Sequence, residues 1–472
     1  MKNKQFSNVN QWLGIPYAKA NRFQKPELLS FDPNGQYNQS GPASLQNFDI
    51  SWLNTDKGAS EDSLNLNVWS PAHVNEKLPV VVYIHGGGFE YGANSQDTSD
   101  LSGMVATEKV VGVSINYRLG IFGWLSLTQY GEPFKETTNL GLQDVITALQ
   151  WVKQNIEQFG GDPNNITVEG HSAGAFISTA LLSAPSAKGL FNRLLLFSSS
   201  AARIIPRWWA EELAHKVIVE LGIQDTPEQL IKMDAKTLMS AFSKVQPRGY
   251  GETHGIDNKI LGTVDDSYLE NGIIKAHPLE VLANGEHKDV DIVFSTTTAE
   301  VDWYAINTPD AFRPESFDEL VEELIKWSKV PRSRAVEIVK FYAEGRSPIE
   351  AKSLMYTDFC FLIPASRGAL AHAKSGGRAY LLNVGPTENN PAVHGTEMYG
   401  IVGQKQPDAT EEQIKRDQIV TDTVYNLTYQ NYDLLWQPVT NKIYTKDIGQ
   451  RPYEGTTYTK RILELFRGID RP

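Results

Sequence analysis

A serine between two glycines directly follows a β-branched run in the first half of this chain. The segment reads Gly170-His171-Ser172-Ala173-Gly174, and the run before it spans residues 166–168. Glycines on both sides of a serine allow a strand and a helix to pack closely around a sharp turn. Apolar residues then recur near helical spacing at Phe176, Ile177, Ala180, Leu181 and Leu182. The pattern predicts a strand, a strained turn that exposes the Ser172 hydroxyl, and a helix, which together form a nucleophile elbow.

A run of three glycines follows an earlier apolar strand. Residues 79–84 lead into His85-Gly86-Gly87-Gly88-Phe89. Such a run brings the backbone close to a substrate and points N–H groups at it. A phosphate-binding loop would require a lysine and a Ser or Thr after the glycines, and both are missing. The run therefore indicates an oxyanion hole.

Further segments resemble the type B carboxylesterase and cholinesterase family of α/β-hydrolases. In chain order they are Gly14-Ile15-Pro16-Tyr17-Ala18, residues 61–69 (EDSLNLNVW), 116–123 (NYRLGIFG), 139–144 (NLGLQD) and 159–163 (FGGDP). The resemblance is strong from about Gly14 to Pro206 and thinner afterwards. It implies an α/β-hydrolase fold and a serine esterase that works without a metal or cofactor.

The serine needs a base, and the base needs a carboxylate. In this fold the chain order is Ser, then Asp or Glu, then His. His394 follows a Pro/Asn-rich turn, and His394-Gly395 resembles the family's catalytic histidine segment, so we predict that His394 is the base. Glu300, soon after the apolar strand 290–294, is the predicted acid, with Asp302 as its rival.

Three positions depart from the family pattern. His171 stands beside the serine where the family most often has Glu, which would weaken attraction for cationic substrates. We expect its side chain to point away from the serine hydroxyl. Ser199 resembles the family's serine that orients the acid, but Ser200 replaces a flanking glycine. Ser63 stands where secreted members carry a cysteine, and Cys360 is the only cysteine.

The remaining site predictions concern the substrate. The backbone N–H groups of Gly87, Gly88 and Ala173 are expected to stabilise the tetrahedral oxyanion. An apolar pocket for the acyl or alcohol part is expected from residues close in sequence to the site, namely Phe89, Trp124, Trp208, Trp303, Phe359 and Met398.

Strand-like runs alternate with helical stretches along the chain. They cover residues 64–69, 80–84, 110–115, 166–170, 194–198, 290–295 and 379–384. This alternation predicts an α/β fold with a mostly parallel twisted sheet and helices on both faces. We expect one domain over 1–472, with a largely helical cap within about 206–345.

Composition narrows the function class. The net charge of −12 and the lack of a basic run argue against nucleic acid as a partner. No signal-like segment or membrane-length apolar run is seen, and no residues have metal-ligand spacing, so a bacterial cytoplasmic enzyme without metal is expected. The prediction is a monomeric or small homo-oligomeric carboxylesterase acting on neutral, fairly hydrophobic small-molecule esters. An amidase, carbamate or lactone hydrolase on the same triad, or a non-catalytic adhesion protein, is the alternative.

Overall fold

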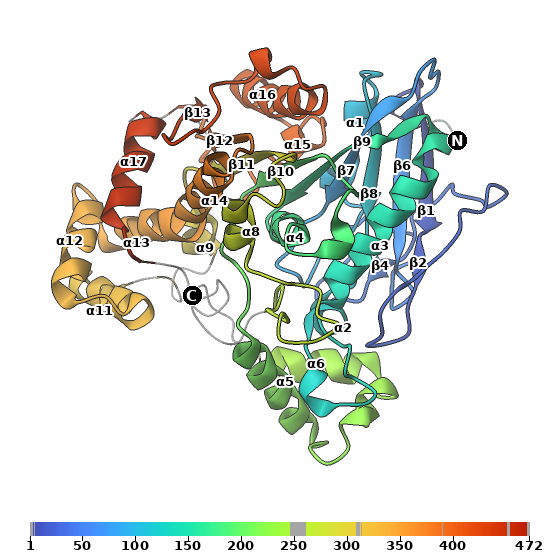
Figure 1. The fold of residues 1–472 in the computed structure, drawn as a ribbon, viewed down its shortest axis with the longest axis horizontal. Coiled ribbons are helices and arrows are strands. Elements are labelled where there is room, and N and C mark those ends of the chain that lie inside the picture. The colour runs from blue at the N-terminus through green and yellow to red at the C-terminus, as the bar shows by residue number, and fades with distance from the viewer. Residues whose placement is uncertain are drawn as a thin grey trace.

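A nine-stranded sheet forms the centre of the molecule (Figure 1). The computed structural model describes residues 3, 5–245, 261–307, 312, 314–388, 390–450 and 454–469. In spatial order the strands are β1 (Val9–Pro16), β6 (Asn65–Pro71), β8 (Val111–Ile115), β7 (Leu78–Ile84), β9 (Gly161–His171), β10 (Arg193–Phe197), β11 (Asp291–Thr297), β12 (Ala379–Val384) and β13 (Thr445–Ile448). Two small two-stranded sheets, β2 (Ala18–Lys19) with β3 (Glu27–Leu28) and β4 (Ala43–Ser44) with β5 (Ala59–Ser60), lie outside it.

The strands from β8 to β13 run parallel, and β6 and β1 continue the sheet in antiparallel pairing. Parallel strands need helical crossovers, which cover both faces of the sheet. Alternation along β7 shows the two faces, because Val80 and Val82 join one apolar cluster and Val81 and Tyr83 join the other. The mostly parallel α/β sheet predicted from the sequence is confirmed.

Helices pack against both of these clusters. On one face lie α3 (Leu140–Asn155), α4 (Ala173–Leu181), α8 (Pro278–Asn284) and α14 (Ile363–Lys374). On the other lie α1 (Ser102–Val105), α15 (Met398–Ile401) and α16 (Glu411–Thr428). A single turn of π-helix, Asp358–Leu362, joins α13 (Pro348–Thr357) to α14.

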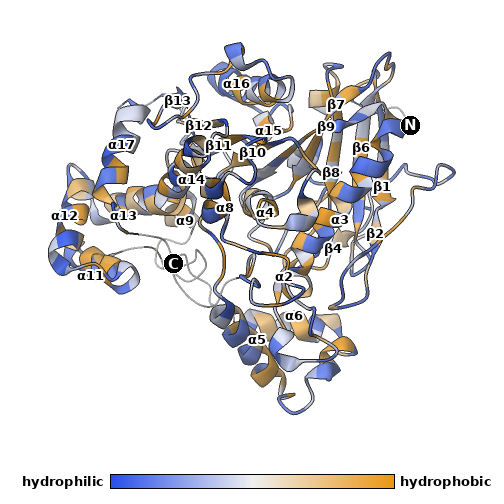
Figure 2. Ribbon diagram, viewed as in Figure 1, coloured by the Kyte–Doolittle hydropathy of each residue, from blue (hydrophilic) through white to orange (hydrophobic). Residues whose placement is uncertain are grey.

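The described part of residues 206–345 is rich in helix. It contains α5 (Arg207–Leu221), α6 (Ala235–Val245), α9 (Asp302–Asn307), α11 (Phe317–Ser328) and α12 (Arg332–Ala343), and β11 interrupts it. Figure 2 shows α5 and α11 with both hydrophilic and hydrophobic stretches, which is typical of helices that bury one face. Residues 246–260, 308–311 and 313 lie outside the described part. That this region acts as a cap, and that the chain is one domain, stay predictions.

The two outermost strands of the sheet escape sequence-based prediction. All seven predicted strands are present, with ends shifted by a few residues, whereas β1 and β13 were not expected. Both are edge strands with only partial burial, and β13 reads Thr-Lys-Asp-Ile. An edge strand has a neighbouring strand on one side and is partly exposed on the other. Its apolar pattern is therefore weak, and its sequence resembles that of a loop.

Candidate active site

The chain turns sharply at Ser172, between β9 and α4. Ser172 has φ 54° and ψ −122°, an unusual conformation for a residue with a side chain. A Cβ on Gly170 would lie 2.5 Å from the carbonyl of Gly174, and a Cβ on Gly174 would lie 2.0 Å from the carbonyl oxygen of Ile84. Only glycine fits at these two places, so the sequence pattern and the strained turn have the same steric origin.

Ser172, His394 and Glu300 form one hydrogen-bonded chain. His394 Nε2 lies 2.7 Å from Ser172 Oγ, and His394 Nδ1 lies 2.6 Å from Glu300 Oε2. Glu300 is fully buried, and its other oxygen accepts a hydrogen bond of 2.7 Å from the backbone N–H of Thr297. Asp302, the rival acid, instead accepts a hydrogen bond from Ser353. The structure therefore brings the first-choice residues together and places Asp302 in a separate interaction.

The glycine run lies beside this serine. Gly86 and Gly87 line the same cavity as Ser172, and Gly87 and Gly88 both have positive φ, 112° and 60°. Within the described part of the chain, the N–H groups of Gly87, Gly88 and Ala173 donate to no protein acceptor. Three free donors near a nucleophile are the arrangement that an oxyanion requires.

A cavity of about 720 Å³ opens in front of Ser172 and His394. Its wall is largely aromatic and apolar, with two uncharged polar side chains, and it includes Trp52, Tyr91, Trp303, Met398, Gln96 and Thr98. Among the described lining residues there is no Asp, Glu, Lys or Arg. Such a cavity suits an uncharged, partly apolar ligand.

A family model of carboxylesterases matches residues 1–430. The chain belongs to the carboxylesterase family. Its sequence is 32% identical over 385 residues to a para-nitrobenzyl esterase of Bacillus subtilis. That alignment covers 79% of this chain and 74% of the relative. It is 31% identical over 385 residues to a pyrethroid hydrolase of Rattus norvegicus, covering 76% of this chain and 65% of the longer relative.

The fold match extends over almost the whole molecule. A crystal structure of a Geobacillus stearothermophilus carboxylesterase superimposes with a TM-score of 0.82 at 28% identity, covering 98% of this chain and 97% of that one. The resemblance that the sequence suggested is therefore confirmed, and this carboxylesterase is a carboxylic ester hydrolase with the α/β-hydrolase fold.

The predicted pocket residues of the carboxylesterase divide into two groups. Trp303 and Met398 line the cavity. Phe89 and Trp124 are buried against one another, with ring centroids 4.7 Å apart, and Phe359 packs against Trp327 in the core with the ring planes tilted by 40°. Trp208 is 66% exposed on α5. The structure thus places two of the six predicted residues at the cavity.

Ser199 is buried, and its hydroxyl lies 3.3 Å from that of Thr179. The structure does not bring it to Glu300. Its neighbour Ser198 donates a hydrogen bond of 3.0 Å to Glu397, a fully buried carboxyl three residues after His394. Sequence reasoning missed Glu397, although its spacing from His394 was an available signal. Burial and the nearby charge of Glu300 raise the pKa of Glu397 to about 7.

His171 is also close to the base. Its ring centroid lies 4.8 Å from that of His394, with the planes tilted by 46°, and His171 lines the cavity. Burial and the neighbouring charge of His394 hold the pKa of His171 well below its usual range. The imidazole of His171, beside the serine, is therefore neutral. Of the two rings, His394 is the one that hydrogen-bonds to the Ser172 hydroxyl.

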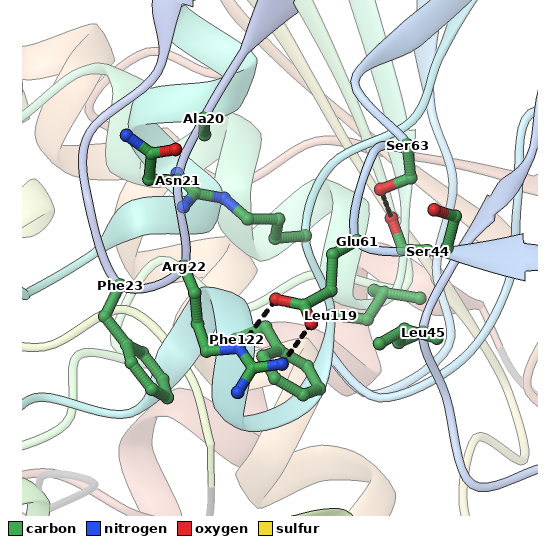
Figure 3. Close-up of a pocket in the computed structure, with 12 residues that line it drawn as sticks. Ala20, Asn21, Arg22, Phe23, Ser44, Leu45, Glu61, Ser63, Leu119 and Phe122 are labelled. Carbon is green, nitrogen blue, oxygen red and sulfur yellow. Dashed lines mark hydrogen bonds and ion pairs between the residues drawn. The ribbon is translucent and has the colours of Figure 1, made fainter. Parts of the chain in front are cut away.

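A second, smaller cavity lies around Arg22 and Glu61 (Figure 3). The guanidinium of Arg22 pairs with the Glu61 carboxylate across it, as Figure 3 shows. Ser63 shares a hydrogen bond of 2.8 Å with Ser44, whose hydroxyl also donates to the carbonyl of Tyr117. A buried hydroxyl pair thus joins these segments.

Among the described residues, no helix combines the length and the apolar character that a membrane span requires. Over the same ranges, no group of three or more His, Cys, Asp or Glu side chains is arranged to hold a metal ion.

Proposed function

We propose that this carboxylesterase hydrolyses neutral, fairly hydrophobic carboxylic esters through an acyl-enzyme on Ser172. The observation that carries the proposal is the continuous hydrogen-bonded chain from Ser172 through His394 to buried Glu300. In this role His394 removes the serine proton, and Glu300 holds the ring in the tautomer whose Nε2 accepts that proton.

The reaction takes two steps. Ser172 Oγ attacks the ester carbonyl, and the N–H groups of Gly87, Gly88 and Ala173 donate to the oxyanion that forms. The imidazolium of His394 then gives its proton to the departing alcohol, which leaves the acyl group on Ser172. A water molecule, deprotonated by His394, attacks that acyl group. The imidazolium returns the proton to Ser172 Oγ as the ester bond breaks, which releases the carboxylic acid and restores the enzyme.

The substrate class follows from the cavity wall. An ion that leaves water for a cavity without opposite charges loses its hydration without compensation, so charged esters are disfavoured. Trp52, Trp303 and Met398 offer apolar surface to an acyl chain or an aryl alcohol. The names of the relatives, a para-nitrobenzyl esterase and a pyrethroid hydrolase, agree with uncharged ester substrates. The cytoplasmic location and the oligomeric state stay predictions.

The experiment is hydrolysis of p-nitrophenyl esters from acetate to decanoate by the purified protein and by Ser172→Ala. We expect turnover of the unchanged protein, an optimum at a chain length that fills the cavity, and loss of turnover in the variant. Retained activity in Ser172→Ala would refute the nucleophile. Turnover of matched p-nitroanilides in preference to the esters would favour the amidase alternative.

A further inference from the structure

His171 contributes an aromatic, uncharged ring to the immediate surroundings of His394. The two imidazole centroids lie 4.8 Å apart, and the ring of Phe361 lies 5.6 Å from that of His394. His171 is 4% exposed, and among the described residues its Nε2 has no hydrogen-bond partner. His394 thus lies near two rings, one of which is a titratable group held without charge.

The other titratable groups that face His394 are two carboxyl groups. Glu300, after β11, binds Nδ1 directly. Glu397, at the start of α15, is buried and accepts from Ser198, and its pKa of about 7 keeps it neutral in acidic solution. Because the described cavity wall has no acidic or basic side chain other than the two histidines, one carboxylate alone stabilises the imidazolium at acidic pH.

We propose that His171 is a positioning residue that sets the acidic limit of ester hydrolysis, by filling the place beside the catalytic imidazole with a neutral ring. A carboxylate there would stabilise the imidazolium of His394 and keep the base protonated to higher pH. The neutral ring of His171 adds no such stabilisation, so Ser172 can be activated in more acidic solution than with a carboxylate at this position. This inference rests on the proposed function.

The test compares His171→Glu with His171→Gln as the uncharged control, through the pH dependence of kcat/KM for p-nitrophenyl butyrate. A unit charge about 5 Å from the imidazolium, in a partly screened site, should stabilise the protonated base. In His171→Glu we expect the acidic limb of the kcat/KM profile to move to higher pH by about 1 to 2 units. The limb should stay in place in His171→Gln, even where the plateau falls, because a structural defect lowers the rate without moving the limb. An unmoved limb in His171→Glu, or an equal shift in His171→Gln, would overturn the proposal.

Two further measurements keep the test decisive. Phosphonate labelling of Ser172 at pH 8 in each variant reports a working nucleophile, so a failure of the proposed function is seen separately from a failure of this inference. If His171→Glu does not fold, ¹⁵N NMR of the unchanged protein titrates the histidines directly. We expect His171 to stay neutral throughout the acidic limb, and protonation of His171 together with His394 would overturn the proposal.

Discussion

Ala299 and Val393 pair in an isolated parallel bridge that ties the loop carrying Glu300 to the loop carrying His394. The N–H of Ala299 donates to the carbonyl of Ala392 over 3.1 Å. The paired residues lie one or two positions before the two proposed catalytic side chains, Glu300 and His394. The bridge fixes the separation of two residues that lie far apart in the sequence, so the carboxylate and imidazole meet before substrate binds.

This arrangement predicts unequal effects for the two carboxylates of the acid loop. Glu300→Gln should lower kcat by about 10³ to 10⁴-fold, because the amide favours the wrong tautomer of the base. Asp302→Asn is the matched control, since Asp302 contacts Ser353 and not His394, and should keep kcat within a few-fold. Steady-state kinetics on one ester measure both. A larger loss in Asp302→Asn would mean that the acid is wrongly assigned.

Gly87 and Gly88 differ in the room around their Cβ positions. A Cβ on Gly87 would lie 1.9 Å from the carbonyl oxygen of Tyr91, whereas a Cβ on Gly88 would meet nothing within 4 Å. Gly87→Ala must therefore displace the backbone of the proposed oxyanion hole and should lower kcat by about 10² to 10³-fold. Gly88→Ala should cost less, from its left-handed backbone alone. Comparison of kcat for the two variants checks this, and equal losses would speak against the steric explanation.

Glu169 lies fully buried in β9, and among the described residues neither carboxyl oxygen has a hydrogen-bond partner. Burial raises the pKa of Glu169 well above its usual range. In the unfolded chain the group ionises from about pH 4 upward, so the free energy of unfolding falls as pH rises from there towards the raised folded pKa.

Glu169→Met removes the buried carboxyl group and with it this loss of stability at higher pH. Its Tm should exceed that of the unchanged protein by about 1 to 3 °C at pH 8, and by less at pH 5, where the glutamate of the unfolded chain is partly protonated. Calorimetry at the two pH values measures the difference. An equal gain in Tm at pH 8 and at pH 5 would show that ionisation of the carboxyl group does not cause the gain.

Arg118 and Asp144 form a buried ion pair. Asp144 accepts from the Arg118 backbone N–H and from two guanidinium nitrogens at 2.7 to 3.0 Å, and its side chain is fully buried. Asp144→Asn leaves the guanidinium buried without its counter-charge and should destabilise the fold by about 3 to 5 kcal/mol.

Denaturant unfolding measures this loss. Glu157→Gln is the control, because its ion pair with Lys77 is more than half exposed and should change stability little. A similar small effect of both substitutions would contradict the importance of the buried pair.

The elements nearest the chemistry were the easiest to predict from sequence. Ser172 and Gly87 lie in short motifs whose backbone geometry only glycine permits, so the residue pattern records the turn itself. His394 and Glu300 depend on contacts across the fold, and the order of the chain with the family resemblance was needed to single them out.

The cavity wall shows where local patterns fail. Trp52 reaches the cavity from an irregular loop. Gln96 and Thr98 reach it from a single 3-10 turn, Asp97–Ser99, and the residue before that turn. Segments this short carry no period in the sequence that would mark their side chains. Phe89 was expected at the cavity, but the chain has φ 70° there and the ring packs on Trp124 in the core. Direction of a side chain in a loop depends on tertiary packing, which the sequence pattern does not encode.

The proposed function requires that Ser172 carries the acyl group. Mass spectrometry of the protein after reaction with an alkyl phosphonate ester tests it most directly, with Ser172→Ala as control. We predict one adduct per chain, located on the peptide that contains Ser172, together with complete loss of ester hydrolysis and no adduct in the variant. An adduct on another residue, or hydrolysis that survives labelling of Ser172, would contradict the account.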